Sequence, residues 1–206
     1  MKQPNPYLDI PSFPDTATLD LPELSNARGR PMEIEVGFGK GHFLMARARA
    51  VPATTLLGIE TRRKWVHLVR ERLTKHRIDN ALVYHGDAGD MFTRFYPDAV
   101  VDRIFVNFPD PWWKARHEKR MVICPDFVRE AVRLLKDNGD FFVQTDVDFR
   151  AEKYRAVLSE NRLLTPAASI DGWVEENRFD ARSLREKKCI ETGLPVFRLH
   201  FSRVSR

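Results

Sequence analysis

The sequence predicts an α/β protein in which helices cover both faces of a mostly parallel sheet. Two observations lead to this class. Short apolar runs typical of buried strands recur from residue 31 onward, and segments with the spacing of amphipathic helices separate them. Strands that alternate with helices are joined by right-handed crossovers, which arrange the strands in parallel and leave a helix layer on each face.

The elements follow one another in a regular order. The expected strands are Glu33–Val36, Thr55–Ile59, Ala81–His85, Val101–Val106 and Phe141–Gln144. The expected helices are His42–Ala50, Arg62–Arg77, Met91–Tyr96, Pro125–Leu135 and Phe149–Glu160. The strongest helical pattern is that of residues 62–77, where one buried face is formed by Trp65, Leu68, Val69, Arg72 and Leu73.

The two ends of the chain depart from this alternation. Residues 1–30 are rich in Pro, Asp and Ser, and we expect a mostly irregular arm before one domain over residues 31–206. Leu163–Ala168 and Val196–Phe201 are strand-like, and a long polar segment separates them. Because apolar and polar residues alternate in the second of these strands, the pattern predicts an edge position for it.

Composition narrows the class of protein. The chain has 206 residues, of which 43% are hydrophobic and 31% charged, as in soluble globular domains. No stretch reaches the roughly 18 apolar residues of a membrane span, and the N-terminus lacks the apolar core of a signal peptide. Cys124 and Cys189 lie far apart without a CxxC or His partner, which indicates reduced thiols in a cytoplasmic protein and no metal site. The net charge of +5 permits nucleic-acid binding without establishing it.

A glycine turn follows the first strand of the domain. Gly37, Gly39 and Gly41 lie between this strand and the helix that begins near His42. Glycines at such a turn let a ligand approach the main chain closely. A tight structural turn is the alternative, and dinucleotide-binding folds use a similar one.

Carboxylates follow the next two strands. Glu60 ends the second strand, where a carboxylate can accept hydrogen bonds from both hydroxyls of a ribose. Asp87 follows the third strand and can accept from the exocyclic amine of an adenine, or instead cap the next helix. Together with the glycine turn, these positions predict an adenosine-containing ligand.

Glu35 decides between two such ligands. It stands just before the first glycine, where its charge would repel a pyrophosphate. A carboxylate there suits a ligand with a cationic end, and S-adenosylmethionine carries both an ammonium and a sulfonium group. The acidic lining therefore favours S-adenosylmethionine over a nicotinamide dinucleotide.

The most unusual stretch of the sequence runs from Phe105 to Arg120 and reads FVNFPDPWWKARHEKR. Its prolines hold Asp110 in one orientation, which suits a carboxylate that takes part in a reaction. Trp112 and Trp113 are either core anchors or surfaces for RNA. The cations after them are a solvated charge run or, because of their place beside the pocket, contacts to a phosphate backbone: Lys114, Arg116, His117, Lys119 and Arg120.

With these motifs, the sequence resembles the bacterial tRNA (guanine-N7-)-methyltransferases. The resemblance covers Met32 to about Phe201 and rests on FPDPWWKARHEKR, EIEVGFGKG, GIE and the Thr145-Asp146 pair. It implies a class I methyltransferase fold, a seven-stranded sheet with an antiparallel last strand. It also implies an enzyme that uses S-adenosylmethionine to methylate N7 of guanine 46 in the variable loop of tRNA. We expect such an enzyme to be a monomer or a homodimer.

The resemblance assigns roles to individual residues. The cofactor-binding acids would be Glu35, Glu60, Asp87 and Asp110, and Asp110 would also be the catalytic residue. Lys114 and Asp146 match substrate-contacting positions. The late Thr-x-(Tyr/Phe)-Glu segment of the family corresponds to Ser183, Leu184, Arg185 and Glu186, with Arg185 in place of the aromatic residue.

Two other classes of protein stay open at this point. One is a nicotinamide-dependent oxidoreductase, which the acidic glycine turn disfavours. The other is a non-catalytic RNA-binding protein on the same sheet, which the four intact pocket acids disfavour.

Overall fold

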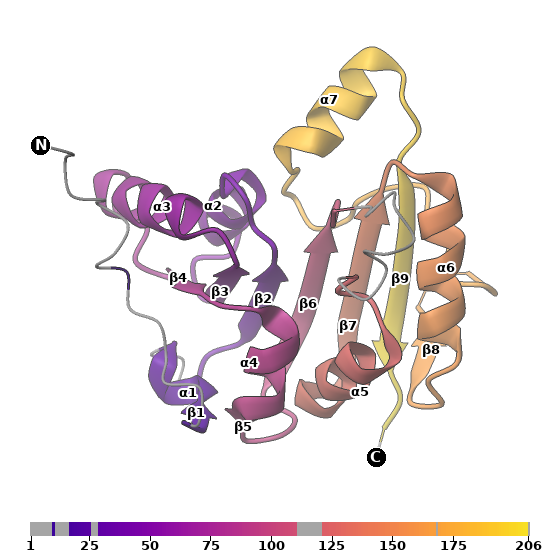
Figure 1. Ribbon diagram of the computed structural model, residues 1–206, viewed down its shortest axis with the longest axis horizontal. Coiled ribbons are helices and arrows are strands. Elements are labelled where there is room, and N and C mark those ends of the chain that lie inside the picture. Colours follow the sequence, from indigo (N-terminus) through magenta and orange to yellow (C-terminus); the bar gives the residue numbers. More distant parts are fainter. Residues whose placement is uncertain (1–9, 11–16, 26–28, 111–120, 168, 206) are drawn as a thin grey trace, which may run out of the picture.

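The computed structural model describes residue 10 and residues 17–25, 29–110, 121–167 and 169–205. A seven-stranded sheet runs through the middle of the molecule in the order β4-β3-β2-β6-β7-β9-β8 (Figure 1). Its strands are β2 Met32–Val36, β3 Thr55–Glu60, β4 Ala81–His85, β6 Val101–Asn107, β7 Leu135–Thr145, β8 Leu164–Pro166 and β9 Phe197–Arg203. Only β9 runs antiparallel to its neighbours. The predicted fold class is confirmed.

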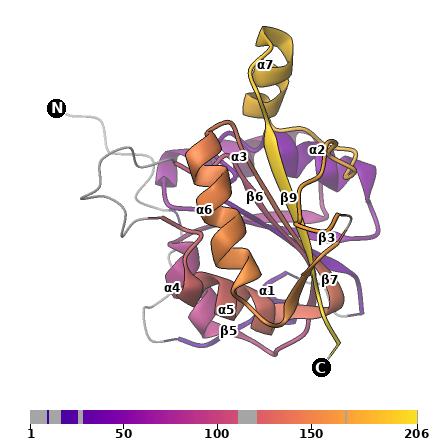
Figure 2. The ribbon, with the colours of Figure 1, turned by 90° about the vertical axis from the view of Figure 1, so that its right-hand side faces the viewer.

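Helices lie on both faces of the sheet (Figures 1 and 2). One layer consists of α2 (His42–Ala50) and α3 (Arg63–Lys75), whose apolar side chains pack on β3 and β4. The other layer consists of α4 (Ala88–Arg94), α5 (Pro125–Leu134) and α6 (Asp148–Ser159). The last helix, α7 (Leu184–Thr192), projects beyond the carboxyl edge of the sheet (Figure 1).

The strand β2 shows how the two layers divide the side chains. Ile34 and Val36 point into the core beneath α4, α5 and α6. Glu33, on the opposite face, forms an ion pair with Arg47 of α2, with 2.7 Å between Arg47 Nη2 and Glu33 Oε1. Glu35 lies two residues further along the same face, so that it points toward α2 at the end of the strand.

The predicted edge position of the last strand is wrong, because β9 lies between β7 and β8. The polar residues that alternate along β9 do not face open solvent, because they are paired with other residues of the protein. Arg198 donates to Glu186 at 3.0 Å, and His200 lies 2.9 Å from Asp140. The short strand β8 forms the edge instead.

The helix predicted over residues 91–96 begins earlier, at Ala88, and ends at Arg94. The Asp87 side chain accepts a hydrogen bond from the Asp90 backbone and caps this earlier start. Phe95 and Tyr96 then form the short strand β5, which pairs with β1 (Leu19–Asp20). Together with α1 (Leu21–Leu24), β1 attaches part of the N-terminal segment to the domain. Among the described residues, no helix is long and apolar enough to cross a membrane.

Candidate active site

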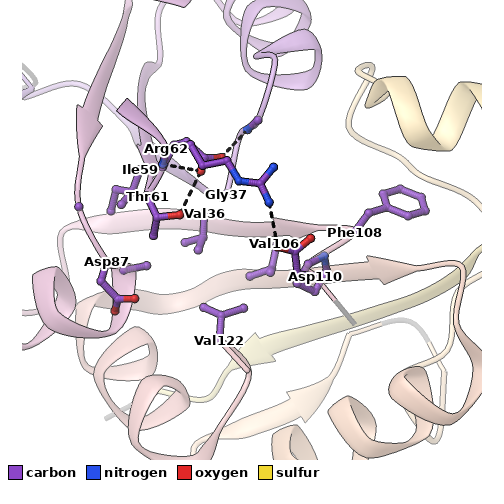
Figure 3. A pocket seen from close by; sticks show the side chains of 15 residues that line it. Val36, Gly37, Ile59, Thr61, Arg62, Asp87, Val106, Phe108, Asp110 and Val122 are labelled. Carbon is purple, nitrogen blue, oxygen red and sulfur yellow. Dashed lines mark hydrogen bonds and ion pairs between the residues drawn. The ribbon is translucent and has the colours of Figure 1, made fainter. Parts of the chain in front are cut away.

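Two adjoining cavities open at the carboxyl edge of the sheet. The first, of about 530 Å³, lies over the ends of β2, β3, β4 and β6 (Figure 3). The second, of about 310 Å³, lies between the glycine turn and the start of α7. Gly37, Gly39 and Phe108 line both cavities. Ligands of open α/β sheets bind at this edge, so the two cavities together define the candidate site.

The glycine turn leaves main chain open to both cavities. Gly37 donates to the Ile59 carbonyl at 2.8 Å, and Gly41 donates to the Phe38 carbonyl at 2.8 Å. At Gly41 the backbone is left-handed (φ 72°), a conformation that favours glycine. A Cβ there would also come within 2.7 Å of the Val69 side chain, so both the backbone and the packing exclude a side chain. Beside Gly37 and Gly39, in contrast, a Cβ would meet no atom within 4 Å. The turn is therefore both fixed and accessible.

Glu60 is held at the wall of the first cavity by backbone donors. One carboxylate oxygen accepts from the Gly39 N–H at 3.0 Å, and the other accepts from the Arg62 N–H at 2.9 Å. These bonds orient the carboxylate and join the end of β3 to the glycine turn. The Thr61 hydroxyl also donates to Oε1 at 3.2 Å, so the further acceptor capacity for a ligand hydroxyl lies mainly on Oε2.

Asp87 is both a helix cap and a residue of the cavity wall, and its predicted contact with an adenine stays a prediction. It caps α4, and it also lines the first cavity, where Figure 3 shows its carboxylate opposite Asp110. The cap bond to the Asp90 N–H uses only one of its oxygens, Oδ1. The second oxygen leaves an acceptor at the cavity.

Glu35 has the most unusual environment in the site. Its side chain is buried, lines the second cavity and accepts a 3.0 Å hydrogen bond from Asn107 on one oxygen. Within the described part of the chain, the other oxygen forms no hydrogen bond. Burial raises the pKa of Glu35 to about 8, against the opposing effects of Asn107 and the Leu44 backbone. A carboxyl with a free, desolvated oxygen suits a cationic ligand group.

Asp110 projects from the loop after β6 on the other side of the first cavity. Its carboxylate lies 3.2 Å from the Arg62 guanidinium, and Figure 3 shows the two side chains meeting. Both side chains are more than half exposed. Before Asp110, Phe108 adopts a left-handed backbone (φ 50°) that non-glycine residues rarely adopt, and its N–H donates to the Gln144 carbonyl at 2.7 Å. The loop is thus anchored two residues before Asp110.

The start of α7 forms the far wall of the second cavity. Ser183 caps the helix by accepting from the Glu186 N–H at 3.1 Å, and Ser183, Leu184 and Arg185 line the cavity. Arg185 forms an ion pair with Asp146 at the end of β7. The structure therefore brings these predicted substrate contacts together at one opening.

Glu186 does not face the cavity. It is fully buried and forms an ion pair with Arg198 at 3.0 Å. It also accepts from Gln144 and from Asn177, each at 3.1 Å. Because these partners surround the carboxylate, Glu186 anchors α7 to β7 and β9.

A chain of buried hydrogen bonds connects the two sides of the site. Gln144 donates to the Asn107 side chain at 2.9 Å, and Asn107 donates in turn to Glu35. Gln144 also donates to Glu186, so the chain extends from the glycine turn to α7. We did not expect Asn107 or Gln144 as site residues, although each is a polar residue near the carboxyl end of an apolar strand. That position was the signal that could have identified them.

Part of the predicted site lies outside the described residues. This applies to Trp112, Trp113 and all five predicted contacts of the basic stretch: Lys114, Arg116, His117, Lys119 and Arg120. Among the residues that are described, no group of three or more His, Cys, Asp or Glu side chains could hold a metal ion.

Comparisons with known proteins agree with this geometry. A family model described as a putative methyltransferase matches residues 29–199. A tRNA (guanine-N(7)-)-methyltransferase of Nitrosococcus oceani is 35% identical over 192 residues, which cover 91% of this chain and 78% of the relative. The enzyme of the same name from Rhodopirellula baltica is 31% identical over 219 residues, covering 100% of this chain and 79% of the relative.

Solved structures share the fold. The crystal structure of the 16S rRNA methyltransferase KamB has a TM-score of 0.64 at 15% identity, covering 88% of this chain and 93% of that protein. The crystal structure of TrmN from Thermus thermophilus has a TM-score of 0.61 at 20% identity, covering 89% of this chain and 47% of that protein.

Proposed function

The chain belongs to the tRNA (guanine-N(7)-)-methyltransferase family, and we propose that it methylates N7 of guanine 46 in the variable loop of tRNA. Membership of this family is what the sequence motifs predicted, and the prediction is confirmed. The chain is a methyltransferase whose methyl donor is S-adenosylmethionine. A tRNA substrate also agrees with the cytoplasmic location that the sequence predicts.

The single observation that carries the proposal is the free oxygen of Glu35 beside an open glycine turn. S-adenosylmethionine supplies a methyl group on a sulfonium and carries an ammonium at its amino-acid end. Glu35 would hold the ammonium, Glu60 the ribose hydroxyls, and Asp87 the adenine amine. A phosphate-bearing dinucleotide would meet a carboxylate at the same turn, which disfavours the oxidoreductase alternative.

The reaction needs alignment more than acid–base chemistry. N7 of guanine has an in-plane lone pair and loses no proton when it attacks, so no general base is required. Positive charge develops on the guanine ring during transfer, and a fixed carboxylate at the site stabilises it. Asp110 is the exposed carboxylate on the rim of the first cavity, and it is our candidate for this role.

The substrate side divides into contacts and supports. We assign contact with the base to Asp146 and to the residues of α7 that line the second cavity, Ser183, Leu184 and Arg185. Glu186 supports them, because its carboxylate is fully buried. We assign contact with the phosphate backbone to the basic stretch Lys114, Arg116, His117, Lys119 and Arg120.

A labelling experiment tests the proposal. The protein is incubated with bulk tRNA and S-adenosylmethionine labelled in the methyl group, and the tRNA is digested to nucleosides. We expect the label in 7-methylguanosine, and its absence from a transcript in which adenine replaces guanine 46. Label in another nucleoside, or none in any, would contradict the assignment, and label in both transcripts would contradict the position.

A further inference from the structure

A second group of cations lies beside the site, separate from the basic stretch after Asp110. Its cations are Lys40 of the glycine turn, Lys64 and Arg72 of α3, and Lys187 of α7, and two uncharged rings lie among them, His42 of α2 and Trp65 of α3. We call it the glycine-turn basic surface. Figures 1 and 2 show α2, α3 and α7 at the same end of the molecule. The surface therefore collects residues that are far apart in the sequence.

Contacts between its members tie the surface together. The Lys40 ammonium lies 5.6 Å from the centre of the Trp65 ring, and the Lys64 ammonium lies 5.7 Å from the same ring. Arg72 donates a 3.0 Å hydrogen bond to the Lys40 carbonyl. Trp65 is thus a half-buried aromatic ring with two cations near it.

His42 lies close to cations from the glycine turn, α3 and α7. Burial lowers the pKa of His42, and the charges of Arg72, Lys187 and Lys40 lower it further. Three members on three different elements therefore act on one imidazole. Lys40 and His42 also line the second cavity, together with Lys188 of α7.

The cations of this surface differ from many arginines of the domain in having no carboxylate partner among the described residues. Arg47, Arg94 and Arg103 each form ion pairs with carboxylates. In the part of the chain that the structure describes, Lys40, Lys64, Arg72 and Lys187 have no carboxylate partner within ion-pair distance. Exposed cations gathered without counter-charges attract a polyanion, and an aromatic ring among them offers a stacking surface for a base.

We propose that the glycine-turn basic surface binds the phosphate backbone of the RNA substrate next to the methylated nucleotide. This inference rests on the proposed function and extends it to a second face of the site. The RNA would contact the domain on both sides of the two cavities, along α3 and α7 as well as along the basic stretch after Asp110. Trp65 would stack on an unpaired base of that strand.

Paired substitutions test this inference. One variant carries Lys40→Gln and Lys64→Gln, and a second carries Lys187→Gln and Lys188→Gln. A third, Arg129→Gln with Arg162→Gln, removes the same charge from exposed positions on α5 and just before β8. Filter binding to tRNA across a salt series gives the dissociation constant and its slope for each, and calorimetry gives S-adenosylmethionine affinity.

Each test variant should bind tRNA about tenfold more weakly near 0.1 M salt, with a slope smaller by about one to two. The control should match the wild type in its affinity for tRNA and for the cofactor. Each test variant should lose more affinity for tRNA than for S-adenosylmethionine, because Lys40 and Lys188 also line the second cavity. Equal slopes for wild type and test variants would overturn the inference while the wild type still methylates tRNA. If the wild type itself neither binds nor methylates tRNA, the proposed function fails instead.

Discussion

Two carboxylates on the same face of β2 have opposite environments. Glu33 is fully buried, and Arg47 donates to both of its oxygens, at 2.7 and 2.8 Å. Arg103 adds a third hydrogen bond at 2.8 Å. Glu35 lies two residues further along the strand. One of its oxygens accepts a hydrogen bond from the neutral Asn107 side chain, and the other, also buried, accepts none in the described structure.

We infer from this difference that Glu33 is a structural carboxylate and that Glu35 is available to a ligand. Glu33 holds α2 and β6 to the middle of the sheet, and its charge is fully compensated inside the protein. The charge of Glu35 lacks such compensation, and this is reflected in the raised pKa. Under the proposed function, the partner of Glu35 would be the ammonium group of the cofactor. The other carboxylates of the site can be compared in the same way, by asking whether cations of the protein compensate their charge.

The largest effect should come from Glu33→Ala. Removing one partner of a buried ion pair leaves Arg47 uncompensated, and such changes cost about 3 kcal/mol or more in the free energy of unfolding. Chemical denaturation measures this cost. The matched control is Asp126→Ala, which breaks an exposed pair with Arg129 and should cost less than about 1 kcal/mol. Equal losses for the two variants would show that Glu33 is not structural.

Glu186 should behave like Glu33, although the family resemblance assigns it to substrate binding. We expect Glu186→Ala to destabilise the protein by about 3 kcal/mol because it leaves the largely buried Arg198 without its carboxylate partner. The KM for tRNA should rise as α7 loosens, while cofactor affinity stays within about twofold. Glu191→Ala, at an exposed position of the same helix, is the control. If the variant lost activity while its free energy of unfolding stayed unchanged, Glu186 would be a substrate-contacting residue.

Asp110 represents a third kind of carboxylate, which is exposed and, among the described residues, forms an ion pair with the exposed Arg62. We expect Asp110→Asn to lower kcat by about 100-fold, the scale seen when one preorganised electrostatic group is removed from a site. Affinity for S-adenosylmethionine should change much less. If calorimetry attributed the whole rate loss to weaker cofactor binding, Asp110 would be a binding residue alone.

The raised pKa of Glu35 should appear in the pH dependence of stability. Between its ordinary value of 4.5 and about 8, the folded protein keeps a proton on Glu35 that the unfolded chain releases. Stability therefore falls as the pH rises through this window, by about 1.4 kcal/mol per pH unit at most. Unfolding of Glu35→Gln, compared with wild type at several pH values, should lack this part of the slope. Parallel curves would place the Glu35 pKa near its ordinary value.

Much of this arrangement could be predicted from sequence because it is local. The strands, the glycine turn and the acids Glu35, Glu60 and Asp87 follow from patterns within a few residues. The environment of each acid could not be predicted in this way. The pattern of alternating residues around Glu33 and Glu35 is the same, and only the fold places arginines beside one and Asn107 beside the other.

The errors have the same origin. Strand β9 seemed to belong at an edge because its polar residues looked solvated, whereas Arg198 and His200 are paired across the sheet with Glu186 and Asp140. These partners come from distant segments, and no local pattern encodes their pairing. Charge pairing between distant segments therefore explains why the polar residues of this strand are compatible with its place inside the sheet.

The most direct test is calorimetric titration of Glu35→Gln with S-adenosylmethionine at pH 7, combined with chemical unfolding of the same protein. A charged hydrogen bond lost from the ligand should weaken binding by about tenfold or more. The free energy of unfolding should be equal to that of wild type or higher, because a poorly compensated buried carboxyl is removed. Unchanged affinity together with a loss of stability like that of Glu33→Ala would contradict the account.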